Sequence, residues 1–233
     1  MAEPSRAETP TAKRVELRPP SNPKSTHVRR VVVLDYGSGN LRSAERAVAR
    51  TGADVTVTSD LRTAAAADGL VVPGVGAYAA CMAGIEQLGA GPVIARRVAA
   101  GRPVLGICVG MQILFETGVE HGVETKGIGL LPGAVTRLTA ARIPHMGWNT
   151  VAPAEGSVLF AGLPAGARFY FVHSYGASDL YALHRAGAKV TTATHDEPFA
   201  AVVEMGALSA AQFHPEKSAD AGFALLRNWV SGL

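Results

Sequence analysis

Short runs of apolar residues recur along the first half of the chain, separated by polar and turn-forming residues. The run at 31–35 reads VVVLD, and similar runs follow at 55–58, 70–72 and 103–107. Aliphatic, β-branched runs of this length are typical of strands buried on both faces of a parallel sheet. The pattern therefore predicts four such strands before residue 108.

Between these runs, apolar residues return at intervals of three and four, which predicts helices. Leu41, Ala44 and Val48 mark a helix after the turn GSGN, with Ser38 or Asn40 as its N-cap. Helical patterns also cover 77–99, the segment MQILF after Cys108, and 219–231. Because strands and helices alternate, we predict a doubly wound sheet.

The second half is richer in short strand-like runs, at 168–172, 190–194, 200–203 and 210–213. The fold class expected is therefore α/β, with a doubly wound, mostly parallel sheet flanked by helices and extra antiparallel strands in the second half. No Gly/Ser-rich linker or internal repeat divides the chain, so we expect residues 31–233 to form one domain.

The charge of the chain is uneven. The 233 residues carry a net charge of +3, but residues 1–30 hold seven Lys/Arg and three Glu, a net +4, which leaves −1 for residues 31–233. This leader has five prolines and no aromatic residue, so we predict a disordered, basic tail. The near-neutral body argues against a nucleic-acid-binding role.

The chain lacks the signals of export. The leader has no apolar h-region, the body has no run of about 18 apolar residues, and the two cysteines are too few for a disulfide scaffold. We therefore expect a cytoplasmic protein that does not bind a membrane.

The strongest chemical signal is GICVGMQ at 106–112. A predicted strand leads directly into Cys108, with glycines two residues before and after it. This is the thiol counterpart of the nucleophile elbow, whose sharp turn leaves no room for side chains at those positions. Cys81, among alanines in a predicted helix, lacks this setting and is expected to be an ordinary buried residue.

A thiol nucleophile needs a base and a group that orients the base. His214-Pro215-Glu216 follows an apolar run, and residues i and i+2 of an extended segment point to the same side. We therefore predict that Glu216 orients His214 beside Cys108. The remaining histidines lack such a neighbour, and we expect surface positions for His121, His145, His184 and His195.

Attack on a carbonyl also needs donors for the oxyanion. The segment PGVG at 73–76 ends a predicted strand, and its glycines allow close approach of backbone amides to a ligand. The predicted oxyanion hole comprises the amides around Gly74, Val75 and Gly76, and that of Val109.

GICVGMQ together with FHPEKS resembles the class I, triad glutamine amidotransferases. The segments DYGSGNLRS, PGVGAY, PHMGWN and YFVHSY narrow the resemblance to the glutaminase subunits of imidazole glycerol phosphate synthases, over about residues 31–231. The resemblance implies that Cys108 forms a thioester with L-glutamine and releases ammonia. The residues that it implies for holding glutamine are Gly76, Gln112, His173, Ser174 and Tyr175.

The resemblance also implies a partner, a cyclase subunit with a (β/α)₈ barrel that receives the ammonia and makes imidazole glycerol phosphate and AICAR. Trp148, Asn149 and Lys217 are the interface candidates. We expect no metal and no cofactor. Val109 stands where the family usually has Leu, which leaves the backbone amide intact.

Three alternatives remain at this point. One is the glutaminase of another synthase, of the anthranilate or aminodeoxychorismate type, against which PHMGWN argues. Another is a stand-alone thiol α/β hydrolase, although its usual order is nucleophile, acid, histidine. The last is a binding module without activity, which the intact Cys108, His214 and Glu216 disfavour.

Overall fold

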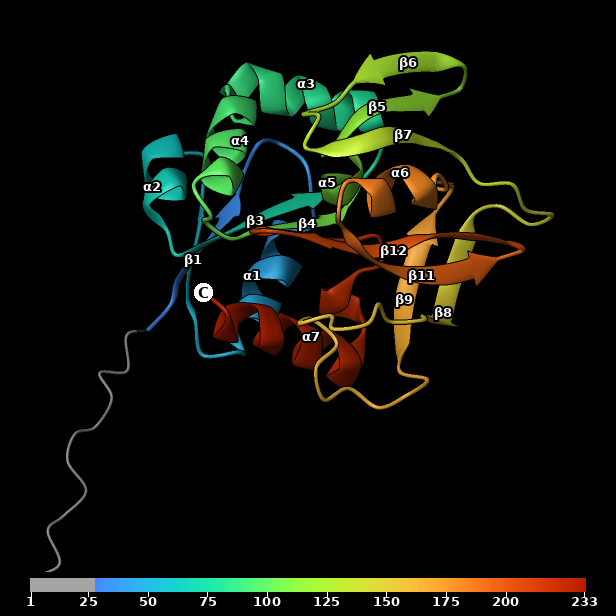
Figure 1. Ribbon diagram of the computed structural model, residues 1–233. Coiled ribbons are helices and arrows are strands. Elements are labelled where there is room, and N and C mark those ends of the chain that lie inside the picture. Colours follow the sequence, from blue (N-terminus) through green and yellow to red (C-terminus); the bar gives the residue numbers. More distant parts are fainter. Residues whose placement is uncertain (1–27) are drawn as a thin grey trace, which may run out of the picture.

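A computed structural model describes residues 28–233, and its central feature is a seven-stranded sheet (Figure 1). The strand order is β11-β12-β13-β4-β3-β1-β2. The strands are β1 (Arg30–Leu34), β2 (Asp54–Thr58), β3 (Gly69–Gly74), β4 (Val104–Cys108), β11 (Lys189–His195), β12 (Glu197–Met205) and β13 (Leu208–Ala211). The predicted leader falls almost wholly on residues 1–27, which lie outside the described residues.

Strand direction within this sheet follows the prediction. β1 to β4 and β13 pair in parallel, whereas β11 and β12 are antiparallel additions from the second half of the chain. The parallel strands are apolar because both faces are covered: Val33, Leu70 and Val104 have no exposed surface. The expected α/β fold class is therefore confirmed.

Helices cover both faces of the sheet (Figure 1). α1 (Leu41–Ala49) and α7 (Ala219–Ser231) lie on one face, and α2 (Leu61–Ala66), α3 (Tyr78–Leu88) and α4 (Gly91–Ala99) lie on the other. Asn40 caps α1 by accepting a hydrogen bond from the Ser43 amide. The buried Arg97 of α4 donates to the carbonyl oxygens of Ala64 and Ala67 at the end of α2. These bonds satisfy carbonyl groups that the short helix leaves without a helical partner.

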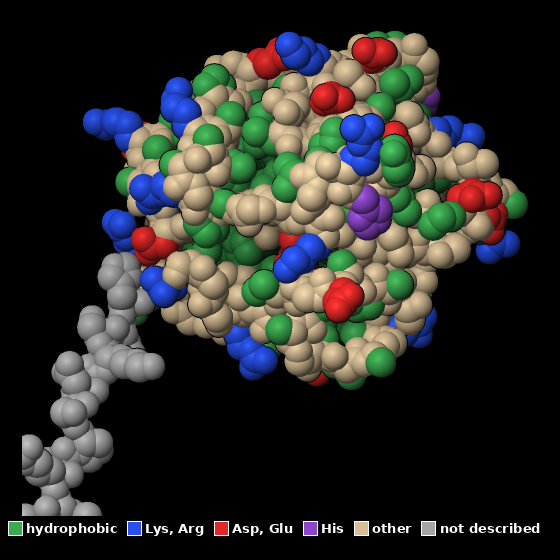
Figure 2. Space-filling model, in the orientation of Figure 1, with side chains coloured by type: hydrophobic (Ala, Val, Ile, Leu, Met, Phe, Trp, Pro, Cys, Tyr) green, Lys and Arg blue, Asp and Glu red, His purple; other side chains and the backbone are tan. Residues whose placement is uncertain are grey.

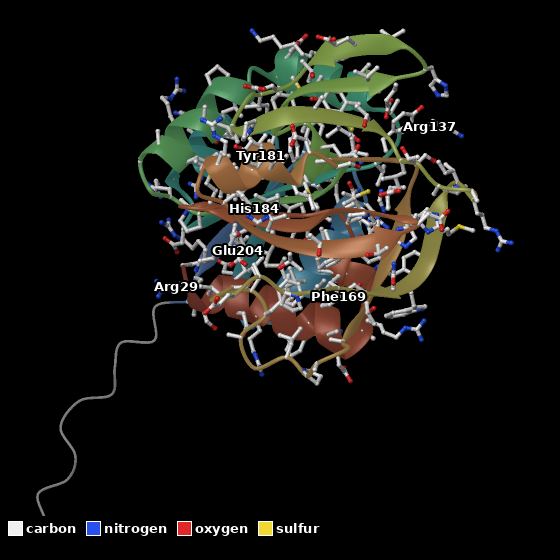
Figure 3. The ribbon with its side chains drawn as sticks, turned by 45° about the vertical axis from the view of Figure 1, so that its right-hand side comes forward. Arg29, Arg137, Phe169, Tyr181, His184 and Glu204 are labelled. Atoms are coloured by element: carbon white, nitrogen blue, oxygen red, sulfur yellow. The ribbon has the colours of Figure 1, made fainter. Side chains whose placement is uncertain are left out.

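Two smaller sheets flank the central one. One has the order β10-β7-β5-β6 and the other pairs β8 with β9 in an antiparallel hairpin. Their strands are β5 (Phe115–Glu120), β6 (Val123–Lys126), β7 (Leu131–Arg137), β8 (His145–Thr150), β9 (Arg168–His173) and β10 (Tyr175–Gly176), and α6 (Leu180–Arg185) follows. On α6, Tyr181 and His184 point outward, and Phe169 of β9 lies deep in the core (Figure 3).

The helix predicted over MQILF is much shorter than expected. α5 comprises only Val109–Gln112, and Phe115 already begins β5. Residues 113–115 are fully or almost fully buried, and an apolar run of this kind fits a buried strand as well as a helix. Pairing with β7 decides in favour of the strand. The predicted helix over 77–99 is likewise divided, because Gly89 adopts a left-handed conformation that ends α3.

The glycines that flank Cys108 are required by close backbone contacts. A Cβ on Gly110 would overlap the carbonyl oxygen of Val72, and one on Gly106 would lie 2.7 Å from the carbonyl oxygen of Gly110. Cys108 itself has φ +56°, a conformation that L residues rarely adopt. The expected sharp turn is therefore present, with β3 and α5 packed backbone against backbone.

Gly110→Ala should destabilise the protein by at least about 2 kcal/mol, because the methyl group meets backbone that cannot move aside. Gly91→Ala, in the first turn of α4, is the matched control. Its Cβ would meet nothing nearer than Ile85 Cγ2 at 3.8 Å, so we expect no loss of stability. Denaturant unfolding of both variants checks this, and equal stability of the two would contradict the close packing at the elbow.

Candidate active site

Cys108 lies at the carboxyl end of β4 and lines a cavity of about 320 Å³. Parallel pairing places Gly74 of β3 directly beside it, and β13 pairs on its other side up to Ala211 and Ile107. Open α/β sheets bind ligands at this edge. The positive φ at Cys108 separates the end of the strand from α5, and the residue is 4% exposed.

His214 and Glu216 follow β13, and His214 lines the same cavity as Cys108. His214 Nδ1 lies 2.7 Å from Glu216 Oε1, and the side chains are 3% and 4% exposed. The extended geometry predicted for this pair is wrong beyond His214, because Pro215–Lys217 forms a 3₁₀ turn, η1. Proline suits the first position of such a turn, and the turn brings the carboxylate back onto the ring.

The electrostatics of the site favour a protonated imidazole. Burial alone would lower the pKa of His214, but the hydrogen bonds and charges of Cys108 and Glu216 outweigh it and raise this pKa to about 9. A protonated His214 stabilises a neighbouring thiolate, which is the reactive form of cysteine. The four-residue α5 adds little to this, because a helix dipole of one turn is weak.

The residues predicted to hold glutamine gather around this cavity. Its walls include Gly76, Gln112, His173, Ser174 and Tyr175, together with Val75, Val109, Glu120, Val172 and Lys217. Gln112 Nε2 donates to the Tyr175 carbonyl at 2.9 Å and to Gln212 Oε1 at 3.0 Å. A larger hollow of about 590 Å³ lies between α3, α4 and β6, away from Cys108. That hollow contains none of the predicted site residues.

The segment predicted to form the oxyanion hole is tied to two neighbouring elements. The Val75 amide donates to Ser38 Oγ at 3.3 Å, and the Val75 carbonyl accepts from Ser38 Oγ at 3.0 Å and from Cys81 Sγ at 3.4 Å. Tyr36 donates to the Pro73 carbonyl at 2.5 Å. Cys81 is buried, as expected, and its thiol also contacts this segment.

His145 is not the surface residue that the sequence predicts. It is 5% exposed, its Nδ1 lies 2.9 Å from His173 Nε2, and its ring stacks on His195. One face of β8 packs against β9 and β11. The His145 imidazole lies on that face, at a core position of the kind that an apolar side chain usually fills. His121 and His184 are exposed as expected, with His184 on the outer face of α6 (Figure 3), and His195 is partly buried.

The tautomers of this histidine pair follow from their partners. His173 Nδ1 faces the Tyr175 carbonyl at 2.9 Å, which only accepts, so Nδ1 carries the hydrogen and Nε2 accepts from His145. His145 Nε2 then accepts from Asn149 at 3.1 Å. Burial lowers the pKa of His145 to about 4 and that of His173 to about 3, so both rings are neutral at pH 7.

The three interface candidates differ in exposure. Trp148 is 45% exposed on β8, beside the 65% exposed Met146, and Lys217 is exposed at the cavity edge. Asn149 is half-buried, and its amide is committed to His145 and to the Thr194 carbonyl. On the face shown in Figure 2, basic and acidic side chains of the described residues are interspersed.

Sequence reasoning missed Gln212 and Glu120. Gln212 is 1% exposed, and its Nε2 lies 3.9 Å from Cys108 Sγ. Glu120 lines the cavity and accepts a hydrogen bond from the Tyr78 amide. The position of Gln212 two residues before His214 is a usable signal, since alternate residues of a strand share a face.

This site defines the class of protein: an α/β protein with a cysteine elbow and a buried His–Glu pair at the carboxyl ends of parallel strands. A family model described as Glutamine amidotransferase class-I matches residues 32–231. The chain therefore belongs to the class-I glutamine amidotransferase family.

Similar proteins identify the branch of this family. The chain is 64% identical to imidazole glycerol phosphate synthase subunit HisH of Mycolicibacterium paratuberculosis, covering 87% of this chain and 98% of that relative. It is 60% identical to the subunit HisH of Streptomyces avermitilis, with 88% and 97% covered.

Solved structures share the fold. A putative GMP synthase protein from Thermoplasma acidophilum has a TM-score of 0.66 at 20% identity, covering 88% of this chain and 94% of that one. PurLQS from Thermotoga maritima has a TM-score of 0.64 at 19% identity, with 88% and 99% covered. In the part of the chain that the structure describes, no helix has the length and hydropathy to cross a bilayer.

Acidification from pH 6.5 to pH 5 should lower the free energy of unfolding by about 1–3 kcal/mol. Unfolded histidines take up protons below about pH 6.5, whereas folded His145 and His173 stay neutral until about pH 4 and 3. His214, with its raised pKa, is already protonated in the folded state, whereas its unfolded form is only half protonated at about pH 6.5, so it offsets a small part of this loss. Its own contribution is present below about pH 6.5 and is lost as the pH rises through 9.

Denaturant unfolding at several pH values measures this effect. His145→Gln should flatten the slope, and His184→Gln, at an exposed position, should leave it unchanged. A wild-type slope that survives in His145→Gln would show that the buried pair is not its source.

Proposed function

We propose that the chain is the glutaminase subunit of an imidazole glycerol phosphate synthase. It hydrolyses L-glutamine to glutamate and ammonia, and the ammonia passes to a cyclase partner that makes imidazole glycerol phosphate and AICAR in histidine biosynthesis. The observation that carries this proposal is the buried Cys108, His214 and Glu216 arrangement beneath a cavity walled by polar residues. The 60–64% identity to HisH subunits supports the choice of reaction.

The cavity suits a zwitterionic amino acid. Lys217 and Glu120 place one positive and one negative side chain on its walls, and Ser174 and Tyr175 add polar groups. Both amide hydrogens of Gln112 are used by Tyr175 and Gln212, so Gln112 Oε1 is left to accept from a substrate ammonium or amide. We assign Gly76, Gln112 and the segment 173–175 to glutamine binding.

The first half of the reaction is acyl transfer to sulfur. The Cys108 thiolate attacks the side-chain carbonyl carbon of glutamine, so a C–S bond forms and the carbonyl becomes a tetrahedral oxyanion. When this intermediate collapses, the C–N bond breaks and His214 gives its proton to the departing amide nitrogen, which leaves as ammonia. Glu216 keeps the ring oriented through its hydrogen bond to Nδ1.

The second half releases glutamate. His214, now neutral, takes a proton from water, and the resulting hydroxide attacks the γ-glutamyl thioester. The C–S bond then breaks, the thiolate is restored, and His214 is protonated again. Atoms and charges balance without any further reactant, which is why neither half requires a metal or cofactor in this scheme.

The oxyanion would be stabilised by backbone amides of the 74–76 segment and of Val109. The Val75 amide already donates to Ser38 Oγ, so it serves the oxyanion only after exchanging that bond. Gly76 and Val109 line the cavity, and their amides are the other proposed donors.

Ammonia released into water is mostly protonated at neutral pH and is then no longer a nucleophile. A partner docked over the cavity would prevent this loss, and we propose a (β/α)₈ cyclase subunit in this position, contacting Trp148 and Lys217, with Asn149 supporting β8 from within. The exposed Met146 and Trp148 provide an apolar patch on β8 for such a contact. We expect the complex to act in the cytoplasm.

Cys108→Ala should abolish glutamine-dependent synthesis of imidazole glycerol phosphate and leave ammonia-dependent synthesis by the supplied cyclase intact. The reason is that only the first reaction needs the thiol. Glutamate release and product formation, measured with glutamine and then with ammonium salt, check this. Glutamate release by the variant would show that the nucleophile is another residue.

Glu216→Gln should reduce glutamine hydrolysis by about 10²- to 10⁴-fold, the usual contribution of a positioned acid–base. The neutral amide removes the negative charge that helps to raise the pKa of His214, so that this pKa falls. The matched control is Glu45→Gln, which removes the carboxylate that pairs with Arg42 on the surface of α1. If both variants retain wild-type activity, Glu216 does not orient the base.

A further inference from the structure

Gln212 occupies the strand position next to the nucleophile. β13 and β4 run in parallel with Ala211 opposite Ile107, so the next residue on each chain brings Gln212 beside Cys108. On the other side of Cys108, the same sheet places Gly74. A side chain can approach the sulfur along the sheet only from the β13 side, because Gly74 has none.

The orientation of the Gln212 amide is fixed by its neighbours. The Tyr175 carbonyl can only accept, so the group of Gln112 that faces it is its amide nitrogen, Nε2, at 2.9 Å. That nitrogen also lies 3.0 Å from the Gln212 amide, which must therefore present its oxygen. Gln212 Nε2 is consequently the atom turned toward Cys108 Sγ, at 3.9 Å.

Burial makes this contact stronger than it would be in water. Gln212, Gln112 and Cys108 are 1%, 3% and 4% exposed. In such surroundings an N–H group aimed at an anionic sulfur is only weakly screened, and a hydrogen bond to a charged group is worth more than one between neutral groups. The same chain of bonds ends at Tyr175, on the cavity wall.

We propose that Gln212 stabilises the Cys108 thiolate through its amide N–H, and that Gln112 holds the amide in this orientation. This inference deepens the proposed glutaminase function and rests on it only for the identity of the substrate. Gln212 thus adds a neutral donor to the charge of His214. Gln112 then has two roles. Its side-chain amide lines the substrate cavity, and the same amide orients Gln212 toward the nucleophile.

The test is the rate of Cys108 alkylation by iodoacetamide as a function of pH, in the full chain and without glutamine or partner. Mass spectrometry of the Cys108 peptide separates this site from the buried Cys81. In Gln212→Met, which keeps the length of the side chain but lacks the donor, the midpoint of the pH profile should rise by about one unit. At a pH below the midpoint, this shift corresponds to an alkylation rate about tenfold lower than that of the wild type.

Two further variants sharpen the result. Gln212→Glu replaces the donor by an acceptor and should raise the midpoint further. Thr191→Val is the control, because Thr191 is a fully buried polar residue of the same sheet whose hydroxyl accepts from the Ala154 amide, away from Cys108. It should leave the alkylation profile unchanged.

A wild-type alkylation profile in Gln212→Met, with only the KM for glutamine increased, would overturn the proposal and reduce Gln212 to a support for Gln112. If Gln212→Met fails to fold, Gln112→Met provides the test, because it leaves Gln212 in place but frees its amide to turn; an unchanged midpoint there would also overturn the proposal. Failure of the proposed function is distinguishable, since the wild-type chain with its partner would then release no glutamate, whatever the alkylation profiles show.

Discussion

The register of three parallel strands is the constraint on which the rest of the site depends. Pairing of β3, β4 and β13 aligns Gly74, Cys108 and the residue after Ala211 across the carboxyl edge of the sheet. A shift of one residue would turn each side chain to the opposite face. The positive φ at Cys108 and the glycines around it fit only this register, because β3 lies close enough to exclude any side chain at Gly110.

Once the strands are in register, burial determines the electrostatics. Removing a thiol and an imidazole from water disfavours isolated charges, but Cys108, His214 and Glu216 are close enough to compensate one another, and the pKa of His214 rises to about 9. His145 and His173 show the opposite outcome. They are equally buried but lack a carboxylate partner in their hydrogen-bond chain, and both are held neutral.

Much of this arrangement could be predicted from the sequence, because buried strands and a glycine-flanked cysteine leave strong local patterns. The strand runs at 31–35, 55–58 and 70–72, the antiparallel second half and the final helix agree with the structure. The errors at the run after Gln112, at His145 and at Gln212 have a common cause, which is that long-range pairing overrides local pattern. The run after Gln112 becomes a strand because β7 is there to pair with it. His145 is buried because β9 and His195 cover it. The contact between Gln212 and Cys108 depends on the register of β13 against β4.

We propose that glutamine is hydrolysed through a thioester on Cys108. It is tested most directly by mixing the chain and its cyclase partner with isotopically labelled glutamine, quenching with acid during turnover, and locating the label by peptide mass spectrometry. We expect a γ-glutamyl group on the peptide that contains Cys108, and its disappearance once glutamine is exhausted. Steady release of glutamate with the label on a different residue would contradict it.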